Sequence, residues 1–437
     1  MTLPTRRAAL LLAAVAPVGL LGYLSPAALD AVLLLDALLA LLVLVDARMA
    51  ADPHVLVVAR EAPAAFSRAR PAEVGYRWRN PAGRPARLVV REARPAILGA
   101  PPAPRALAVP ARGATAERFR LTPPQRGAGT GGWLAVRSVG PLGLGQRQAR
   151  LDLPWDVMVF PTLPETRLKA SVAAAVRRRE AGFSAQRQRG EGRVFESLRE
   201  WVPGDDTRII DWKATARRRK LIARAYEVER RQHVLLLLDA GRLLTAEVAG
   251  TPRLEYAVDA AVSLALAAVH HDDDVGILVF ADTVLHYVAP QRGRRALRQV
   301  LDVLARAEPA MVEPDYPAAF RFLSVHNRRR ALAVLFTDVI DRAASGALVA
   351  NVVTLRPRHL PLAVTLRDPE LDAAALARPR DAPQAYRKAA AEELLRARDD
   401  ALTVMRRSGV VVLDVPPGRA GPAVVDRYLE LKRRGRL

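Results

Sequence analysis

Aspartates that directly follow apolar segments are the residues of this 437-residue chain best suited to bind a metal ion. Leu235–Leu238 runs into Asp239, and Val334–Phe336 runs into Thr337 and Asp338. In open α/β sheets, ligands bind outside the carboxyl ends of the strands, and carboxylate oxygens suit magnesium. Helix capping or turn formation is the favoured interpretation for three further aspartates that end apolar segments: Asp282, Asp368 and Asp414.

Other catalytic constellations are missing from the sequence. It has no G-x-S-x-G elbow, no Walker-type phosphate loop and no H-E-x-x-H pair. Zero cysteines exclude disulfides, thiolate metal sites and cysteine nucleophiles. His270–Asp274 has a metal-like composition, but adjacent histidines on a helix point about 100° apart, which favours a solvated helix end. We therefore expect a protein that is not an enzyme and has no cofactor.

Residues 190–231 form the densest charged segment of the chain. Val202–Asp205 reads as a turn, and Asp206 or Thr207 can cap a short helix that runs to Ala216. Opposite charges alternate around two tryptophans, Trp201 and Trp212. The candidate partner-binding residues are Arg199, Glu200, Asp205, Asp206, Arg208, Asp211, Trp212, Lys213 and Arg217.

Two interpretations of this segment stay open. It could be a structural segment whose charged residues form ion pairs with one another, while Trp201 and Trp212 pack it against the sheet. It could instead be a docking face for a protein, or a site for an anionic ligand on its arginines. The formal net charge is +22, but the arginines are spread along the chain and no nucleic-acid-binding module is recognisable, so nucleic acid is disfavoured. Contact with anionic lipid headgroups is the simpler expectation for a protein beside a membrane.

The first fifty residues predict a transmembrane helical hairpin. Ala8–Leu24 carries no charge, and Pro26–Val45 is interrupted only by Asp30 and Asp36. Helices of these lengths span roughly 26 and 30 Å, the range of a bilayer core. Arginines flank both outer ends, so the positive-inside rule predicts a two-span inner (plasma) membrane protein with the bulk of the chain in the cytoplasm. A cleaved signal peptide is the alternative, and the second apolar segment argues against it.

The rest of the chain changes pattern twice. About six short alternating segments between residues 51 and 160 predict a small antiparallel β-sandwich. Gly127–Gly132 lies within them, and we expect a flexible hairpin loop there instead of a phosphate loop. After residue 232, apolar strands alternate with helices, as in a mostly parallel sheet covered on both faces. The predicted fold is multidomain: a transmembrane hairpin (1–50), a β-sandwich (51–160), a basic linker with the charged segment (161–232) and a doubly wound α/β domain (233–437).

Residues 192–231 closely resemble the signature of the domain of unknown function 58 family. The resemblance lies in Phe195, Leu198–Glu200, Pro203–Asp206, Arg208, Ile210–Lys213, Ala216, Arg217 and Leu221, and it extends to Gly140–Leu144, Val157–Pro161 and Tyr428–Lys432.

The resemblance implies a von Willebrand factor A-like C-terminal domain. Such domains often hold a metal on Asp-x-Ser-x-Ser after the first strand. Here Asp239 is present, but Gly241 and Leu243 replace the two hydroxyl residues, and Thr337-Asp338 matches the later loop. We therefore expect a degenerate metal site at Asp239 and Asp338 that does not hold magnesium, with the two aspartates capping loops or Asp239 pairing with Arg242.

Relatives of this kind are often encoded beside MoxR-type AAA+ ATPases. The leading hypothesis is therefore a membrane-anchored cytoplasmic scaffold or assembly factor that binds a protein partner, plausibly such an ATPase, through the signature segment and the α/β domain. The alternative is a divalent-metal-dependent hydrolase or an adhesion-type metal-binding domain, either of which would use Asp239 and Asp338. The hydrolase would use the Asp205-Asp206 pair as well.

Overall fold

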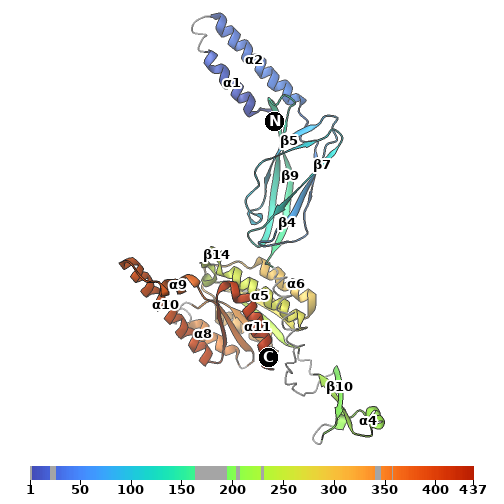
Figure 1. Ribbon diagram of the computed structural model, residues 1–437, viewed down its shortest axis with the longest axis vertical. Coiled ribbons are helices and arrows are strands. Elements are labelled where there is room, and N and C mark those ends of the chain that lie inside the picture. The colour runs from blue at the N-terminus through green and yellow to red at the C-terminus, as the bar shows by residue number, and fades with distance from the viewer. Residues whose placement is uncertain are drawn as a thin grey trace. The chain divides into compact units, whose positions relative to one another are not determined.

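The computed structural model describes residues 2–19, 26–162, 194–202, 207–227, 231–339, 346–356 and 358–437. The chain divides into two compact units, Met1–Thr162 and Leu163–Leu437 (Figure 1). Each unit has its own hydrophobic core.

The first unit begins with a short strand and two helices, β1 (Thr2–Pro4), α1 (Arg6–Gly19) and α2 (Pro26–Met49). No helix among the described residues is both long and apolar enough to cross a membrane. The predicted transmembrane hairpin was therefore wrong, and so were the multidomain fold class that began with it and the two-span inner-membrane location. At 14 residues α1 is about 21 Å long, against about 30 Å for a bilayer core. The longer α2 carries Asp30, Asp36 and Asp46.

Asp46, near the end of α2, connects this helix to the loop between β8 (Gly127–Val139) and β9 (Gly145–Phe160). Its carboxylate is fully buried and accepts hydrogen bonds from the backbone N–H groups of Leu142 (2.7 Å), Leu144 (2.7 Å) and Gly145 (2.8 Å). The loop can wrap the carboxylate because it carries glycine there: a Cβ on Gly140 would lie 2.4 Å from Asp46. The aspartate fixes α2 to the β-rich part of the unit.

Two sheets form the rest of the first unit. One has the order β1-β9-β8-β5-β6, with β3 paired to β9, and the other has the order β2-β4-β7. Tyr76 and Trp78 of β4 meet Leu88 of β5 and Leu134 of β8 in one buried core between the sheets. The strands are β2 (Val57–Glu61), β3 (Phe66–Ser67), β4 (Ala72–Arg79), β5 (Ala86–Ala93), β6 (Arg105–Val109), β7 (Ala114–Leu121), β8 (Gly127–Val139) and β9 (Gly145–Phe160).

The glycine-rich stretch at 127–132 lies inside β8, so the expectation of a flexible hairpin loop was wrong. Glycine is needed there for close packing: a Cβ on Gly129 would lie 2.4 Å from Ile97, and one on Gly132 would lie 2.7 Å from the carbonyl of Ala93. Gly131 and Gly132 have positive φ angles at a register shift in the pairing with β9, which is the conformation that glycine permits.

The second unit begins with a small two-stranded element. Antiparallel strands β10 (Val194–Glu200) and β11 (Ile222–Glu227) flank a 3₁₀ turn (Thr207–Ile209) and helix α4 (Trp212–Arg218). Residues 203–206 of this element lie outside the described residues.

A six-stranded sheet with the order β16-β15-β12-β17-β18-β19 organises the remainder. All neighbours pair in parallel except β16, an antiparallel edge strand that the sequence pattern did not reveal. The strands are β12 (His233–Asp239), β15 (Asp274–Phe280), β16 (Val284–Gln291), β17 (Leu332–Phe336), β18 (Leu360–Leu366) and β19 (Val411–Val415), with a separate short hairpin of β13 (Glu247–Val248) and β14 (Thr251–Pro252).

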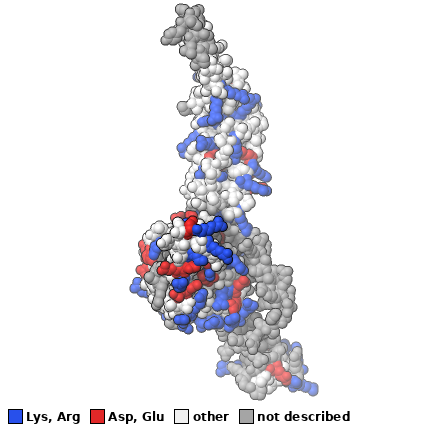
Figure 2. All heavy atoms as spheres, turned by 60° about the vertical axis from the view of Figure 1, so that its left-hand side comes forward, with Lys and Arg blue, Asp and Glu red and all other residues white. Residues whose placement is uncertain are grey.

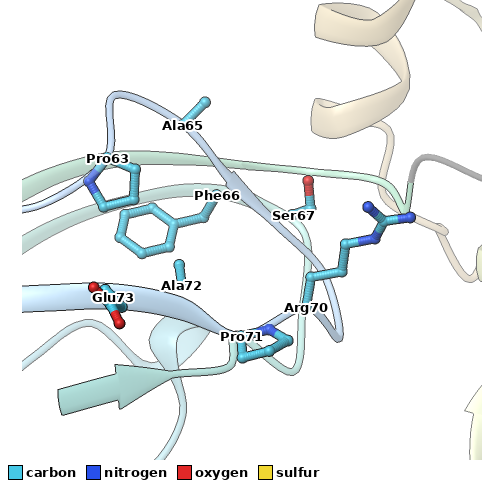
Figure 3. Close-up of a pocket in the computed structure, with 8 residues that line it drawn as sticks. All are labelled: Pro63, Ala65, Phe66, Ser67, Arg70, Pro71, Ala72 and Glu73. Atoms are coloured by element: carbon cyan, nitrogen blue, oxygen red, sulfur yellow. The ribbon is translucent and has the colours of Figure 1, made fainter. Parts of the chain in front are cut away.

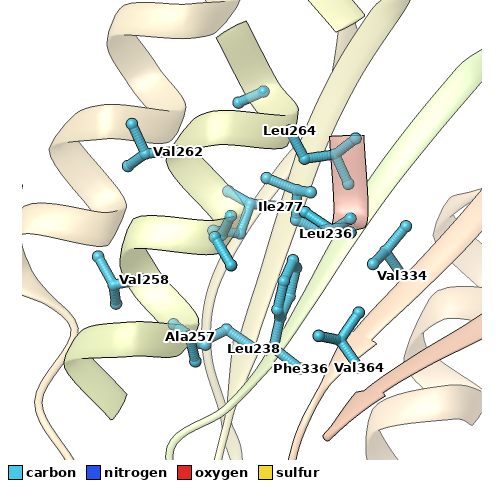
Figure 4. Packing of buried hydrophobic residues seen from close by; sticks show 14 of the residues in the cluster. Leu236, Leu238, Ala257, Val258, Val262, Leu264, Ile277, Val334, Phe336 and Val364 are labelled. Atoms are coloured by element: carbon cyan, nitrogen blue, oxygen red, sulfur yellow. The ribbon is translucent and has the colours of Figure 1, made fainter. Parts of the chain in front are cut away.

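Helices cover both faces of this sheet (Figure 1). Alternate residues of β12 point to opposite sides: Leu236 and Leu238 join one core, and Leu235 and Leu237 join the other. The first core packs under α5 (Arg253–His270), α6 (Gly293–Arg306) and α11 (Ala420–Arg433), and Figure 4 shows Ala257 and Leu264 of α5 beside its strand residues. The second packs under α7 (Tyr316–His326), α8 (Gly346–Val352) and α10 (Ala382–Arg407), while α9 (Pro369–Leu376) has no buried residue.

Candidate functional site

Asp239 ends β12 and is fully buried among hydrogen-bond donors. One carboxylate oxygen accepts from the backbone N–H of Gly241 (2.8 Å), and the other accepts from the hydroxyls of Tyr316 (2.7 Å) and Thr337 (2.6 Å). Burial raises the pKa of Asp239, and these three donors oppose that rise without cancelling it. Burial likewise raises the pKa of Tyr316, so the phenol keeps the proton that it donates. No local pattern in the sequence points to Tyr316 as a partner of Asp239, because Tyr316 begins a helix 77 residues further along the chain.

Asp338 follows β17 and lies between two buried guanidinium groups. One carboxylate oxygen accepts hydrogen bonds from Arg398 (2.7 Å) and from the backbone N–H of the next residue, Val339 (2.8 Å). The other oxygen accepts from Arg253. Both arginines are among the few buried charged residues of the described chain. Asp338 therefore has a cationic partner on each side.

Two further aspartates complete this arrangement. Arg253 also donates to Asp368 (2.9 Å), and Arg398 also donates to Asp414 (2.7 Å). Both arginines donate to the carbonyl of Leu366 at the end of β18, each at 3.1 Å. We call these five residues the arginine–aspartate cluster: Arg253, Arg398, Asp338, Asp368 and Asp414.

The cluster joins five elements at the carboxyl edge of the sheet: α5, α10 and the ends of β17, β18 and β19. Burial alone lowers the pKa of the Arg398 guanidinium, but Asp338 and Asp414 outweigh that effect and raise it above its ordinary value. Charge-assisted bonds in a dry environment are stronger than surface ion pairs, and removing one partner leaves the other charge buried. The cluster therefore fixes the loops that follow three parallel strands.

The residues at this edge do not fit the adhesion-type metal site that the family resemblance implies. Gly241 leaves no room for a hydroxyl side chain, because a Cβ there would lie 2.8 Å from Pro314. Leu243 is buried, and Arg242 forms an ion pair with Glu313. No group of three or more His, Cys, Asp or Glu in the described part of the chain could hold a metal ion. Asp239 bonds to hydroxyls and Asp338 to guanidiniums, so their acceptor oxygens are already engaged.

The candidate partner-binding residues fall on the small element of β10, α4 and β11. Arg199 and Glu200 end β10, and Arg208 lies in the 3₁₀ turn. Asp211 is the N-cap of α4 and accepts from the backbone N–H of Ala214 (3.0 Å). Trp212, Lys213 and Arg217 lie on α4 itself, and Asp205 and Asp206 lie outside the described residues.

Backbone pairing gives this element a fixed frame. Arg199 pairs with Ala223 and Glu200 with Ile222 across the two strands. Beyond the strands, Trp201 N donates to the carbonyl of Leu221, and Asp211 N donates to that of Ile222, each at 2.8 Å. Ile210, Ile222 and Ala223 are buried in its interior. We call residues 194–202 and 207–227 the docking segment.

Trp212 lies on the outside of that frame. Its side chain is 67% exposed, so it does not pack against a sheet as one of the two interpretations proposed. Val202 and Leu221 are exposed nearby in the chain, and Lys213 and Arg217 are exposed on the same short helix. An exposed indole beside cationic side chains can bind another protein, because tryptophan and arginine are enriched among the residues that dominate interface energies.

The family model "Protein of unknown function DUF58" matches residues 197–375. Within residues 197–375 the chain is similar to the DUF58 family. The DUF58 match covers most of the docking segment and both Asp239 and Asp338, but it ends before Arg398 and Asp414. Three members of the arginine–aspartate cluster, Arg253, Asp338 and Asp368, are therefore inside the matched region, and two are outside it.

Two mycobacterial relatives are similar over a larger part of the chain, and a third relative over a smaller part. Uncharacterized protein Rv1480 of Mycobacterium tuberculosis is 27% identical over 263 residues, which are 57% of this chain and 80% of that protein. Uncharacterized protein Mb1516 of Mycobacterium bovis has the same identity and coverage. Uncharacterized protein YeaD of Bacillus subtilis is 30% identical over 106 residues, 24% of this chain and 26% of that protein.

A solved structure of the CARDB domain of the PF1109 protein from Pyrococcus furiosus matches 24% of this chain and 86% of that chain. Its sequence identity is 19% and its TM-score 0.18, so it carries no inference about this protein.

A shallow depression lies on the first unit, beside β3 and β4 (Figure 3). Its volume is about 470 Å³, and its floor is Phe66, which is almost completely buried. Its lining offers one carboxylate, Glu73, one hydroxyl, Ser67, and one guanidinium, Arg70, among prolines and alanines. Nothing in the lining of this depression pairs a nucleophile with a base.

Proposed function

We propose that this protein is a scaffold or assembly factor that binds a protein partner through the docking segment, and that it acts without catalysing a reaction. The observation that carries the proposal is Trp212, whose indole is 67% exposed at the start of α4. Burying such a ring in a partner's pocket stabilises a complex by far more than an average contact.

The frame around Trp212 supports this role because it reduces the entropy that binding would cost. Asp211 caps α4 directly before the tryptophan, and Thr215 accepts from the backbone N–H of Ile222 (3.0 Å), which fixes α4 to β11. The ring is thus presented from a helix that is held at both ends of its first turn.

The hydrogen bonds of Asp239 and Asp338, the two metal ligands predicted from the sequence, favour a partner-binding function over metal-dependent hydrolysis. Asp239 accepts three hydrogen bonds within the protein, and Asp338 lies between Arg253 and Arg398. A metal ion would have to displace two buried guanidiniums, each of which would then lose carboxylate partners in a dry environment. We therefore assign these residues to stability.

The partner class that we propose is a MoxR-type AAA+ ATPase, which the family resemblance implies. Exposed Lys213 and Arg217 on α4 would face an acidic surface on that ATPase and guide its approach. Salt should therefore slow association more than it speeds dissociation.

Binding of the full chain to the MoxR-type ATPase encoded by the same organism tests the proposal. Trp212→Ala should weaken the complex more than tenfold, because truncating a central aromatic residue costs about 2–4 kcal/mol. Tyr386→Ala is the matched control, since Tyr386 is an aromatic residue that is 78% exposed and lies outside the docking segment. Equal dissociation constants for wild type and Trp212→Ala would contradict the proposal, and so would a control variant that loses as much affinity as Trp212→Ala.

A further inference from the structure

Nine exposed arginines gather at the amino edge of the α/β sheet, where β17, β18 and β19 begin. Leu332 of β17 pairs with Leu360 of β18, and Leu362 of β18 pairs with Val411 of β19, all in parallel, so the loops before these strands leave the sheet on one side. The end of α11 reaches the same side. We call these residues the basic edge: Arg328, Arg329, Arg330, Arg356, Arg358, Arg406, Arg407, Arg433 and Arg436.

Hydrogen bonds between the loops show that they lie side by side. Arg330 donates to the carbonyl of Arg436 (3.1 Å), and Arg356 donates to that of Ser408 (3.0 Å). Arg358 donates to the carbonyl of Ser324 (2.9 Å), at the end of α7. Figure 2 shows blue side chains along the lower margin of the α/β domain, where Figure 1 marks the C-terminus, with red side chains higher on the same face.

The positive charge of the basic edge is not neutralised within the described part of the chain. None of its nine arginines forms an ion pair with a described carboxylate. The nearby acids have other partners. Asp273 is buried and bonded to Lys432 (2.7 Å) and Tyr428. Glu430 pairs with Arg434 (2.6 Å) and Arg427 (2.5 Å).

Helix dipoles explain only part of this surplus. The negative end of the helix dipole favours arginine in the last turn of a helix, which accounts for Arg406 and Arg407 on α10 and Arg433 on α11. The effect fades beyond the last turn. Arg329 and Arg330 lie beyond the end of α7 at His326, and adjacent like charges repel one another. The loops therefore hold more positive charge than the helix ends require.

We propose that the basic edge binds an acidic segment of another protein, a stretch rich in Asp and Glu. The guanidinium group matches a carboxylate through two parallel hydrogen bonds. The starts of β17, β18 and β19 span about 10 Å at a strand spacing of about 4.8 Å, a length that an extended segment covers in three or four residues. Several bonds from these arginines to backbone carbonyls hold them in place before a partner arrives.

Carboxylates are preferred here to nucleic acid because the arginine-bearing loops carry no exposed aromatic ring. The segments 328–330, 356–358, 406–408 and 433–436 contain none. Beside them, His359 is buried, and the ring of the exposed His326 is stacked on Phe322 (3.9 Å between centroids). Single-stranded nucleic acid is bound largely by stacking its bases on such rings. This surface shares no residue with the docking segment, so the two proposals can fail independently.

Fluorescence anisotropy of the full chain with a labelled octaglutamate peptide tests the assignment. Wild type should bind the peptide with an affinity that falls steeply as salt rises. Replacing four exposed arginines that bond to nothing else described, Arg328→Gln, Arg329→Gln, Arg406→Gln and Arg407→Gln, should weaken binding more than tenfold. Arg378→Gln with Arg380→Gln is the control, since these exposed arginines lie between α9 and α10 in the same domain, and binding should stay within twofold.

Three results would overturn the assignment. One is the absence of saturable peptide binding by wild type at low salt. Another is a control variant that loses as much peptide affinity for each arginine replaced as the four-arginine variant does, which would mean that the peptide is attracted only by the net charge of the protein. The last is tighter binding of single-stranded DNA with the same number of charges, weakened by the four substitutions, which would make the edge a nucleic-acid surface. Circular dichroism melting of each variant shows that the folds are the same.

Discussion

The two edges of the α/β sheet use arginine in opposite ways. At the carboxyl edge, Arg253 and Arg398 are buried, and each bonds to two aspartates. At the amino edge, Arg406 and Arg407 are exposed, and among the described residues neither forms an ion pair. Arg398 and Arg406 belong to the same helix, α10, eight positions apart. The difference shows that the edge of the sheet beside which an arginine lies, and not the residue type, decides whether it stabilises the fold or remains available to a partner.

Loss of a buried arginine should have the largest effect. Arg398→Met keeps the length and apolar stem of the side chain but leaves Asp338 and Asp414 without their shared cation. Breaking a buried pair in this way costs about 3–5 kcal/mol of unfolding free energy. Urea denaturation followed by circular dichroism measures it.

Arg406→Met is the matched control for that variant. It is the same substitution on the same helix at an exposed position, and its unfolding free energy should lie within about 0.5 kcal/mol of wild type. Equal destabilisation by the two substitutions would remove the contrast between the edges.

The buried carboxylate at the amino edge should show the next largest effect. Tyr428→Phe removes a hydroxyl that donates to Asp273, which is almost completely buried and keeps Lys432 as a partner. Loss of a hydrogen bond to a buried charge should cost about 1.5–3 kcal/mol. Thermal unfolding measures it, and Tyr386→Phe on the exposed part of α10 should change little. If both phenylalanine variants melt like wild type, Asp273 does not depend on the tyrosine.

The pH dependence of Asp239 should follow from its burial. Its pKa is raised in the folded protein, so the folded state holds a proton that the unfolded chain releases above about pH 3.9. The stability that this proton contributes is complete below the unfolded pKa and is lost as pH rises through the folded one. The unfolding free energy of wild type minus that of Asp239→Asn should therefore decrease as pH rises from 4. Other carboxylates titrate in both proteins and cancel, so a difference that increases with pH would contradict this.

Salt should give the smallest effect. Screening shortens from about 30 Å at 0.01 M to about 3 Å at 1 M ionic strength, which relieves repulsion among the exposed arginines. Wild type should gain a few tenths of a kcal/mol in stability between these conditions, and Arg406→Gln with Arg407→Gln should gain less. Melting temperatures in sodium chloride measure this, and an equal gain in both proteins would show that the amino edge is not strained by its charge.

Period-based reasoning located most elements of the second unit. Strand β12 (His233–Asp239) and helix α5 (Arg253–His270) follow one another in the alternation of apolar strands and helices that the sequence predicts after residue 232. Buried parallel strands are apolar throughout, so they stand out from their surroundings. The antiparallel edge strand β16 was missed because its residues are mixed in polarity and partly exposed.

Local composition misled where tertiary contacts fix the backbone. Gly127–Gly132 has the composition of a flexible loop, yet it forms part of β8 because Ile97 and Ala93 approach too closely for any side chain. The apolar residues near the N-terminus suggested two membrane spans, yet α1 is too short and the aspartate at the end of α2 is bonded to a backbone loop.

The sequence by itself determined the similarity to the DUF58 family, the strand and helix periods of the α/β sheet and the position of Asp239 and Asp338 at strand ends. Those features depend on residues that are near one another in the chain. Only the tertiary structure decided that Tyr316 and Thr337 bond to Asp239, that Arg253 and Arg398 enclose Asp338, and that nine other arginines meet at the opposite edge. These partners are separated by tens to more than a hundred residues, and parallel strand order, which no local pattern specifies, brings them together.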